Sequence, residues 1–546
     1  AIVKQKIPVQ GQTFRDEVQQ VRGSNGWVVS PSRTGNGRAI LANDMHLSLT
    51  APVIWYAATL RYQDRLLTGM TVPGVPGITL GSNGHIAWGF TNTSGDFLDL
   101  MPLEIHPEQD NLYQTPDGWQ EFTVKTEDIA IRGKQPEQVT IRSTIWGPVS
   151  PRPLLGKDVA LRWTLLDPDA TNCAILDIDQ VRTVQDAIDL MHHFGAPPMN
   201  AMLADSAGHI GWTLCGKIPL RPSPLLSENA GPTAGSWEEY IPAGKVPCLV
   251  DPPEGFLITA NNRTTGADYP FLIGSNYASG YRATQIASQL RQMQNVTEAE
   301  MFDLQLESIC TFYQFYQQLS LTLLTPVALA QSPFLKEVHQ EVKAWDGRAE
   351  TQSRGIALLV AFREALATHI LEAYLSPCLQ KEETFLYGWN AMERPLRTIL
   401  TVRDPAIFPF EETFANWEAF LLATLEECAR KELKKIKGKE LSQLTWGKVH
   451  RTRIAHPLGL ANPLLGKLLN MPEKPLAGTP FSIRASAPGY GVTVRLVVSP
   501  SHEQEGKYHL PTGQSGRIFS RNYRDQYRYW LKGIGLAVAA HSRKHV

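Results

Sequence analysis

The chain has 546 residues, of which 43% are hydrophobic and 19% charged, so we expect a globular protein with more than one packed substructure. Its formal net charge of −1 argues against nucleic acid as the main partner. The 6 cysteines form no Cys-x-x-Cys pair, which disfavours a zinc site or a dense disulfide framework. No apolar run in the sequence reaches the ~18 residues of a membrane-spanning helix.

The start of the chain is polar, and residues 1–23 are typical of a flexible terminus or of a spacer that is later removed. Because Ala1 is neither an initiator Met nor part of a signal-like segment, we expect a mature form or the later part of a longer precursor. Short β-prone runs separated by Gly, Asn and Pro then predict a large, mostly antiparallel sheet system over residues 27–162.

The middle of the chain mixes helix and strand signals. Apolar residues at helical spacing predict a helix over residues 184–194. Two β-prone runs at 201–204 and 210–215, joined by a turn sequence, predict a hairpin. Residues 256–260 are typical of a buried strand.

A mainly helical insertion is expected over about 297–439. Its four predicted helices lie at residues 298–324, 334–342, 355–375 and 411–437. Strands and loops return after residue 444, with a strand at 492–498 and a last helix at 525–532. The fold class that these elements indicate is α+β.

Several common enzyme signatures are missing from the sequence. It contains no Gly-x-Ser-x-Gly, which disfavours an α/β-hydrolase. It also contains no His-Glu-x-x-His and no Gly-x-x-x-x-Gly-Lys-Ser/Thr, which disfavours a zinc protease and a phosphate-binding loop.

The step from Gly23 to Ser24 separates the polar start from the first β-prone run. If this peptide bond is cut, Ser24 gains a free α-amine beside its own hydroxyl. An α-amine has a pKa of about 7.7–8.0, so it can act as a general base near neutral pH. One residue would then supply both nucleophile and base. The alternative is that Ser24 is an ordinary loop residue in an unrelated β-rich binding module.

Segments along the whole chain match one known pattern. They are Ser24-Asn-Gly-Trp-Val-Val, Leu41-Ala-Asn-Asp-Met-His-Leu, Gly81-Ser-Asn-Gly-His-Ile-Ala-Trp-Gly, Met199-Asn-Ala, Thr259-Ala-Asn-Asn, Trp446-Gly, His456-Pro-Leu and Gly513-Gln-Ser-Gly. In this order and spacing the chain resembles the penicillin acylase family over nearly all of residues 24–546.

The resemblance implies an N-terminal-nucleophile αββα sandwich, in which two stacked antiparallel sheets lie between helical layers. It also implies a precursor with an upstream α segment, a spacer and a β segment. Residues 1–23 would be the end of the spacer and residues 24–546 the β segment. The α segment, absent from this chain, would be the partner in a heterodimer, and the location would be periplasmic or otherwise extracytoplasmic.

The resemblance also assigns catalytic roles. Ser24 would attack the amide carbonyl, and the same hydroxyl could first attack the carbonyl of Gly23 in self-processing. The side-chain amide of Asn200 and the backbone N–H of Asn92 would stabilise the oxyanion. The side chain of His46 would lie near the α-amine and tune it.

Two further assignments concern support and metal binding. Arg221 matches a family arginine near the site, although a structural ion pair is an equal alternative. Asp96, the carbonyl of Leu98 and Asp99 resemble the family's calcium loop, and carboxylate and carbonyl oxygens suit this ion. As a bare pattern, Asp-x-x-Asp is more often a solvated turn. No organic cofactor is expected.

The expected acyl pocket contains Leu47, Leu80 and Phe90. Penicillin G acylases place phenylalanine at the positions of Leu47 and Leu80, and a glutamine at the position of His46. Aliphatic lining favours an alkyl chain over an aromatic ring. The sequence therefore favours an acylase for aliphatic N-acyl amides, of the acyl-homoserine-lactone type. The alternatives are a β-lactam (penicillin or cephalosporin) acylase and a catalytically silent member that acts as a binding protein.

Overall fold

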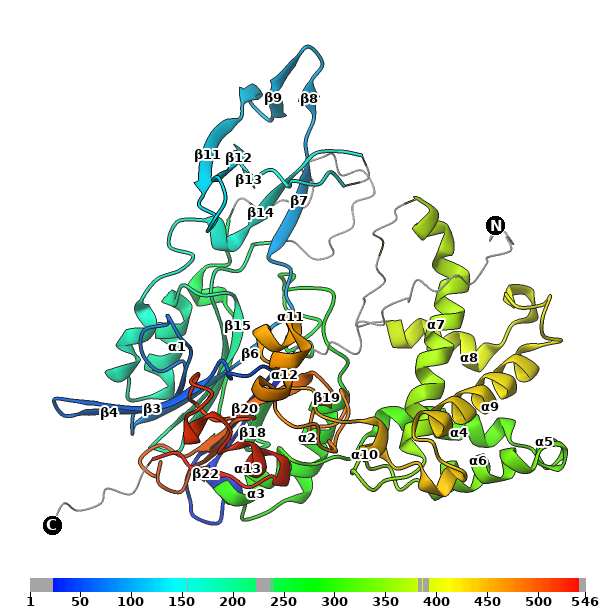
Figure 1. The fold of residues 1–546 in the computed structure, drawn as a ribbon. Helices are drawn as coiled ribbons and strands as arrows, with labels where there is room; N and C mark the ends of the chain where they lie inside the picture. The colour runs from blue at the N-terminus through cyan, green and yellow to red at the C-terminus, as the bar shows by residue number, and fades with distance from the viewer. Residues whose placement is uncertain are drawn as a thin grey trace.

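The computed structural model describes residues 23–154, 156–221, 237, 239–381, 385 and 392–539. The predicted spacer, apart from Gly23, lies outside the described residues. Two antiparallel sheets are stacked in the body of the molecule, a β arm extends from one side of it, and a helical unit lies beside it (Figure 1).

The first sheet has 7 strands and carries the segment that begins at Gly23. Its strands, in spatial order, are β18 (Phe256–Thr259), β1 (Gly23–Val29), β2 (Ile40–Ser48), β20 (Tyr490–Val498), β21 (Lys507–His509) and β22 (Leu536–Ala537), with β19 (Ser486–Ala487) paired to β20. Strand β1 is therefore internal, hydrogen-bonded to β18 on one side and to β2 on the other.

The second sheet also has 7 strands. In spatial order they are β17 (Cys248–Val250), β16 (Ile210–Cys215), β15 (Met199–Asp205), β6 (Ile86–Asn92), β5 (Leu80–Ser82), β4 (Arg65–Thr71) and β3 (Tyr56–Tyr62). The predicted hairpin is the pair β15–β16, in which Ala201 lies opposite Thr213.

Alternating side chains of β1 build two different cores. Val28 packs between the sheets, in a cluster that includes Met202 of the second sheet. Trp27 and Val29 point to the other face and pack against Ile286 of α2 (Tyr281–Gln292). This is the pattern of a strand buried on both faces.

Helices cover the outer face of each sheet. The helices α2 and α3 (Glu298–Leu304) cover the first sheet, because their apolar residues share a cluster with Trp27 and Ile40. Helix α1 (Val184–His193) covers the second sheet, where its Ile188 packs with Trp88. The predicted αββα sandwich is therefore confirmed, and the layers are visible in Figure 1.

The β arm consists of short strands with largely exposed side chains. They are β7 (Leu98–Pro102), β8 (Ile105–His106), β9 (Gln109–Thr115), β10 (Gly118–Glu121), β11 (Thr123–Ile129), β12 (Glu137–Thr144), β13 (Gly147–Pro148) and β14 (Val159–Trp163). A small cluster around Met101, Tyr113 and Phe122 is the core of the arm.

The helical unit has its own large core, centred on Phe312, Tyr316 and Phe362. Its helices are α4 (Gln314–Leu323), α5 (Pro326–Gln331), α6 (Pro333–Ala344), α7 (Ile356–Lys381), α8 (Glu393–Val402) and α9 (Trp417–Lys435). Four short helices follow: α10 (Trp446–Val449), α11 (Pro457–Ala461), α12 (Pro463–Leu469) and α13 (Tyr527–Lys532). No helix among the described residues is long and apolar enough to cross a membrane.

The single helix predicted over residues 298–324 is wrong, because the chain forms α3 and α4 with a break between them. In the break, the backbone N–H of Cys310 donates to Gly347 O at 2.8 Å, and that of Ala349 donates to Ser308 O at 3.0 Å. These tertiary hydrogen bonds replace helical ones, which the apolar spacing of the segment does not reveal.

Candidate active site

Ser24 is buried, with 2% of its surface exposed, in the second position of β1. Its neighbour across the strand pair is Met45 of β2, and Gly23 lies opposite His46. The backbone N–H of Ser24 donates to Asn261 Oδ1 at 2.8 Å. Ser24 thus lies on an internal strand with its nitrogen bonded to Asn261.

Two N–H donors converge on the Ser24 hydroxyl oxygen. The backbone N–H of Asn92, at the end of β6, lies 3.3 Å from Oγ. The side-chain Nδ2 of Asn261 lies 3.2 Å from the same atom. Of these two donors, the sequence prediction named only Asn92.

Asn261 is the residue that the sequence prediction missed. It follows strand β18 and has a left-handed backbone with φ of 66°, a conformation that asparagine tolerates better than most residues. Its amide donates to Ser24 Oγ and to Asn92 O, while its Oδ1 accepts from the Ser24 N–H. The sequence signal for this residue was the pair Asn261-Asn262 just after a β-prone run, but nothing in the local sequence indicated what the pair does.

The structure does not bring the amide of Asn200 to Ser24. Its Nδ2 donates to Asn92 O at 3.3 Å, and its Oδ1 accepts from Trp212 Nε1 at 3.0 Å. The reason is register: Asn200 lies on β15 directly opposite Thr91 of β6, so its amide meets the β6 backbone. Among the described residues, it is Asn261 whose side chain donates a hydrogen bond directly to Ser24 Oγ.

A second buried amide joins the two sheets at this point. Asn43 Nδ2 donates to Asn25 O at 2.7 Å and to Phe90 O at 3.0 Å, and its Oδ1 accepts from the Phe90 N–H at 3.0 Å. A Cβ on Gly89 would lie 2.7 Å from Asn43 Oδ1, so only glycine allows this approach. These hydrogen bonds of Asn43, here called the amide clamp, hold β6, and with it Asn92, against β1.

Arg282, the second residue of α2, is a further residue that no sequence motif indicated. Its Nη1 donates to Ser24 O at 2.8 Å, and its Nη2 donates to Asn261 Oδ1 at 2.9 Å. Complete burial lowers the pKa of Arg282 to about 10, partly offset by the charge of Asp44, so the guanidinium still carries its proton at neutral pH. A fixed positive charge therefore lies beside Ser24 and Asn261.

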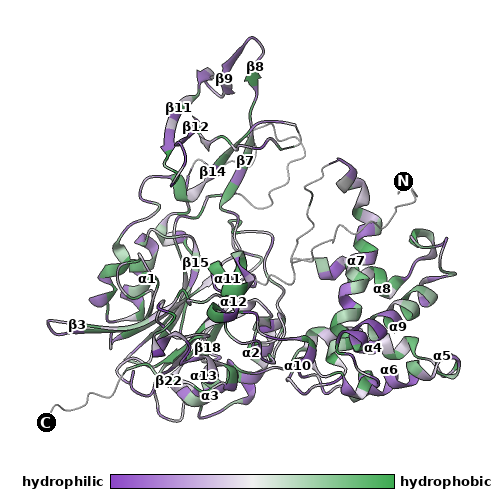
Figure 2. Ribbon diagram, viewed as in Figure 1, coloured by the Kyte–Doolittle hydropathy of each residue, from purple (hydrophilic) through white to green (hydrophobic). Residues whose placement is uncertain are grey.

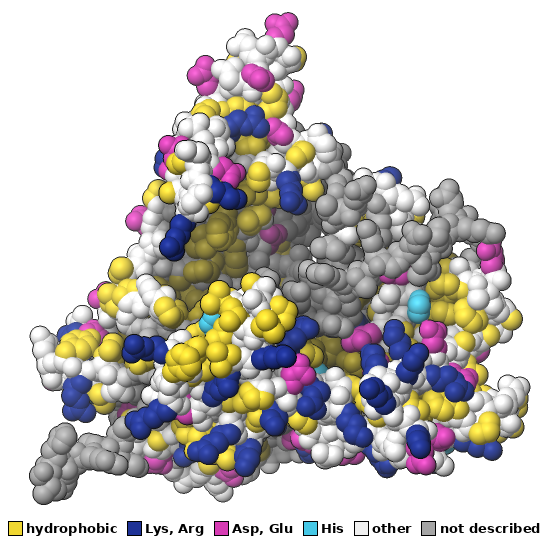
Figure 3. Space-filling view, in the orientation of Figure 1, with side chains coloured by type: hydrophobic (Ala, Val, Ile, Leu, Met, Phe, Trp, Pro, Cys, Tyr) yellow, Lys and Arg dark blue, Asp and Glu magenta, His cyan; other side chains and the backbone are white. Residues whose placement is uncertain are grey.

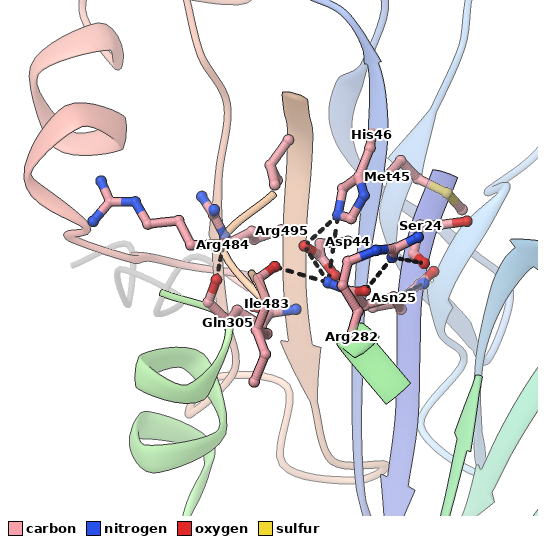
Figure 4. A network of polar contacts seen from close by, with 12 residues as sticks. Ser24, Asn25, Asp44, Met45, His46, Arg282, Gln305, Ile483, Arg484 and Arg495 are labelled. Carbon is pink, nitrogen blue, oxygen red and sulfur yellow. Dashed lines mark hydrogen bonds and ion pairs between the residues drawn. The ribbon is translucent and has the colours of Figure 1, made fainter. Parts of the chain in front are cut away.

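His46 lies on the other face of the first sheet. Its Nε2 is 2.9 Å from Asp44 Oδ2 and 3.4 Å from Asn25 Nδ2. Figure 4 shows the Ser24 and Met45 side chains directed to one side and His46 and Asp44 to the other. Burial lowers the pKa of His46, and the Asp44 carboxylate opposes this shift only in part. No hydrogen bond among the described residues joins the ring to Ser24; Asn25 lies between them.

The three predicted pocket residues lie in two adjoining hydrophobic clusters. Leu47 and Leu80 pack in the cluster between the sheets. Phe90 packs in the cluster under α1, with its ring centroid 6.2 Å from that of Phe194. Met45, the cross-strand neighbour of Ser24, packs against both clusters. Through Met45, the two clusters that contain Leu47, Leu80 and Phe90 therefore reach the neighbourhood of Ser24.

Arg221 lies beside the predicted metal loop. Its Nη2 is 2.9 Å from Asp99 Oδ1 and 3.4 Å from Asp96 O. Burial raises the pKa of Asp96; the charge of Arg221 opposes this shift, and that of Asp99 adds to it. Asp99 Oδ2 is buried without a hydrogen-bond partner, and the described residues contain no cluster of three or more His, Cys, Asp or Glu for a metal. Leu98 begins β7, opposite Trp163.

Comparisons with known proteins agree with this architecture. The solved structure of a thermostable penicillin G acylase from Alcaligenes faecalis matches with a TM-score of 0.71 and 18% identity, covering 96% of this chain and 99% of that one. The acyl-homoserine lactone acylase QuiP of Pseudomonas aeruginosa is 27% identical over 94% of this chain. The penicillin acylase 2 proenzyme of Pseudomonas sp. (strain SE83) is 26% identical over 93%.

This chain spans 66% of the length of each of these two relatives, just under two thirds. The penicillin amidase family model matches residues 3–542, which is nearly the whole sequence. The fold, the order of the motifs and this match lead to one conclusion. The chain belongs to the penicillin amidase family.

Proposed function

We propose that this chain hydrolyses N-acyl amides with Ser24 as an N-terminal nucleophile. The observation that carries the proposal is the convergence of Asn92 N and Asn261 Nδ2 on Ser24 Oγ, at 3.3 and 3.2 Å. A buried hydroxyl with two N–H donors beside it has the parts of an acyl-transfer site.

The first step that we propose is self-processing. Ser24 Oγ forms a bond to the carbonyl carbon of Gly23, the peptide C–N bond breaks, and the nitrogen leaves as the Ser24 α-amine. Water then hydrolyses the resulting ester and leaves a carboxylate on Gly23. A Cβ on Gly23 would lie 2.6 Å from Asn261 Oδ1 and 3.0 Å from Arg282 Nη2, so glycine suits this position.

In the processed enzyme the α-amine takes the proton of the Ser24 hydroxyl, directly or through a water, as Oγ attacks the substrate carbonyl. Asn261 Oδ1, which accepts from the Ser24 nitrogen at 2.8 Å, would orient the amine. The nearby charge of Arg282 disfavours the protonated amine and so favours the base form. The N–H groups of Asn92 and Asn261 would stabilise the oxyanion, and water would release the acyl group from Ser24.

Processing is tested on the full-length precursor by intact mass and N-terminal sequencing. We expect the wild-type precursor to yield a fragment that begins at Ser24, and the Ser24→Ala variant to stay uncut and to lose labelling by phenylmethylsulfonyl fluoride. Ser32→Ala, a change at a nearby exposed serine, is the matched control and should process normally. An uncut Gly23–Ser24 bond in an active enzyme would falsify the mechanism.

The oxyanion assignment is tested by comparing Asn261→Ala with Asn200→Ala. Loss of one direct donor typically lowers kcat by about 10²–10³-fold, so we expect this loss for Asn261→Ala. Asn200→Ala should have a smaller effect, because that amide bonds the carbonyl of Asn92. Single-turnover rates of the processed variants give the comparison, and the mass of each precursor separates defects in cleavage from defects in turnover. A greater loss of single-turnover rate in Asn200→Ala than in Asn261→Ala would show that Asn200, and not Asn261, is the oxyanion donor.

For the substrate we propose an aliphatic acyl chain. Support comes from Leu47 and Leu80 in the apolar space between the sheets, and from the relative that carries the name acyl-homoserine lactone acylase. The other relative, a penicillin acylase 2 proenzyme, supports the alternative of a β-lactam acylase. Either activity would amount to the degradation of a quorum signal or an antibiotic.

A panel of amides with one reporter amine and different acyl groups separates these substrates. We expect kcat/KM to rise with the length of a linear acyl chain and to be lower for phenylacetyl. The variant Leu80→Phe should shift the ratio towards phenylacetyl, because a ring then replaces alkyl lining. A wild-type enzyme that accepts only phenylacetyl groups would contradict the argument from the leucines.

We also propose a structural calcium ion at Asp96, Leu98 O and Asp99. The buried, unpartnered Asp99 Oδ2 and the raised pKa of Asp96 fit a site that gains from a hard cation. Added calcium should raise the Tm of the wild type by a few degrees, because a ligand that binds only the folded state stabilises it. Asp99→Asn should lose this calcium-dependent shift, whereas Asp110→Asn, at an exposed position in the arm, should keep it. An equal shift in both variants would exclude the site.

The last part of the proposal concerns assembly and location. We propose that a separate α segment associates with this chain and that the protein works outside the cytoplasm. The greater length of both relatives, and the name proenzyme of one of them, support the first point. The mass measurement on the full-length precursor also tests whether such a segment stays bound after cleavage.

A further inference from the structure

Two short helices, α11 and α12, present an unusual set of exposed leucines. We name as the leucine patch the side chains of Leu458, Leu460, Leu464, Leu465 and Leu468, all of which are exposed. Leu460 and Leu464 reach 74% and 75% exposure. Figure 2 shows this helix pair as hydrophobic, although it lies on the surface.

The packing of the helix pair explains why the leucines point outwards. The helices approach each other through Gly459 and Gly466: a Cβ on Gly459 would lie 3.0 Å from the Cα of Gly466 and 2.4 Å from Asn470 Oδ1. The side chains of His456 and Asn462 cap the two helices. The contact between the helices therefore uses small residues, and leaves no room to bury leucines between them.

The base of the patch is fixed to the strand that carries His46. The backbone N–H of Ala51, three residues after the end of β2, donates to Ala455 O at 3.1 Å. Leu49 and Ile454, which flank this contact, belong to one buried cluster with Tyr523. Leu469 of α12 is also buried. The helix pair that carries the leucine patch is thus joined to the segment that follows β2.

A second segment, the loop before α13, adds an exposed ring. Phe519 is 89% exposed, and its loop is joined to α12 because Tyr523 Oη donates to Leu469 O at 2.6 Å. Arg524 donates to Asn470 O at 2.9 Å from the same loop.

The charges in the segments that carry the patch are mainly positive. Residues 446–474 and 511–532 together hold ten Lys or Arg and only two carboxylates, Glu473 and Asp525, in a chain whose net charge is −1. Lys467, Arg453, Arg517 and Arg521 are exposed in these segments. Figure 3 shows hydrophobic side chains over α11 and α12, bordered by Lys and Arg, beside the central hollow.

We propose that the leucine patch and its basic border bind the surface of an anionic lipid bilayer. Exposed leucines and a phenylalanine can enter the boundary between headgroups and acyl chains, while Lys and Arg contact anionic headgroups. The basic border is complementary to an anionic lipid surface, which attracts clusters of Lys and Arg beside an apolar patch. The patch would hold the molecule where amphiphilic acyl compounds gather, and it does not depend on the proposed catalytic mechanism.

Flotation of the full-length protein with phosphatidylcholine vesicles, with and without phosphatidylglycerol, tests the proposal. We expect binding only to the anionic vesicles and weaker binding at high salt. The double variant Leu460→Asp/Leu464→Asp should bind at least about tenfold more weakly. The variant Arg517→Glu/Arg521→Glu should lose most of the preference for phosphatidylglycerol. Because all four side chains are exposed, folding should be unchanged, which circular dichroism checks.

The matched control is Val327→Asp/Val402→Asp, at positions 68% and 65% exposed on the helical unit, and it should bind as the wild type does. Absence of wild-type binding to anionic vesicles, or equal binding by the leucine variant, would overturn the proposal. So would a leucine variant that keeps vesicle binding but changes oligomeric state or loses a bound chain segment, because the patch would then be a protein interface.

Discussion

The candidate site depends on one amide clamp between the two sheets. Asn43 offers its amide to Phe90 much as a neighbouring strand would, and it also bonds the carbonyl of Asn25. Without it, buried backbone groups would lose partners at a cost of about 1–3 kcal/mol each. The clamp fixes the distance between β1 and β6, and that distance places the N–H of Asn92 beside Ser24 Oγ.

Around this clamp the molecule separates two kinds of chemistry on the two faces of one sheet. The face towards the second sheet holds the Ser24 hydroxyl and apolar neighbours such as Met45. The other face holds a buried polar network in which Asp44 lies near His46, Arg282 and Arg495 (Figure 4). Burying so many charges costs desolvation free energy that can exceed their mutual attraction, so this network need not stabilise the fold. Its value is that Arg282 fixes Ser24 O and Asn261 in one geometry.

Sequence reasoning reached the fold and part of the site. Local patterns located the hairpin of β15 and β16 and most helices, because each depends on periodicity and turn residues close in the chain. It failed between α3 and α4, where hydrogen bonds to residues 347–349 break the helix. At the site it named Ser24 and Asn92, which lie in contact, and Asn200, whose amide bonds Asn92 O. It gave no role to Asn261, whose amide bonds Ser24 Oγ. Asn200 lies near the start of β15 and Asn261 just after β18, and only the strand order shows which of them reaches Ser24 Oγ.

The sequence by itself determined the family, the α+β class and the position of Ser24 at the start of the first strand, because these depend on motif order and local spacing. Only the tertiary structure decided which groups meet at that serine. Asn261 and Arg282 lie more than two hundred residues from Ser24, and pairing of β18 with β1 and packing of α2 on the first sheet bring them to it. Register across strands also sends His46 to the opposite face, since neighbouring side chains on a strand alternate sides.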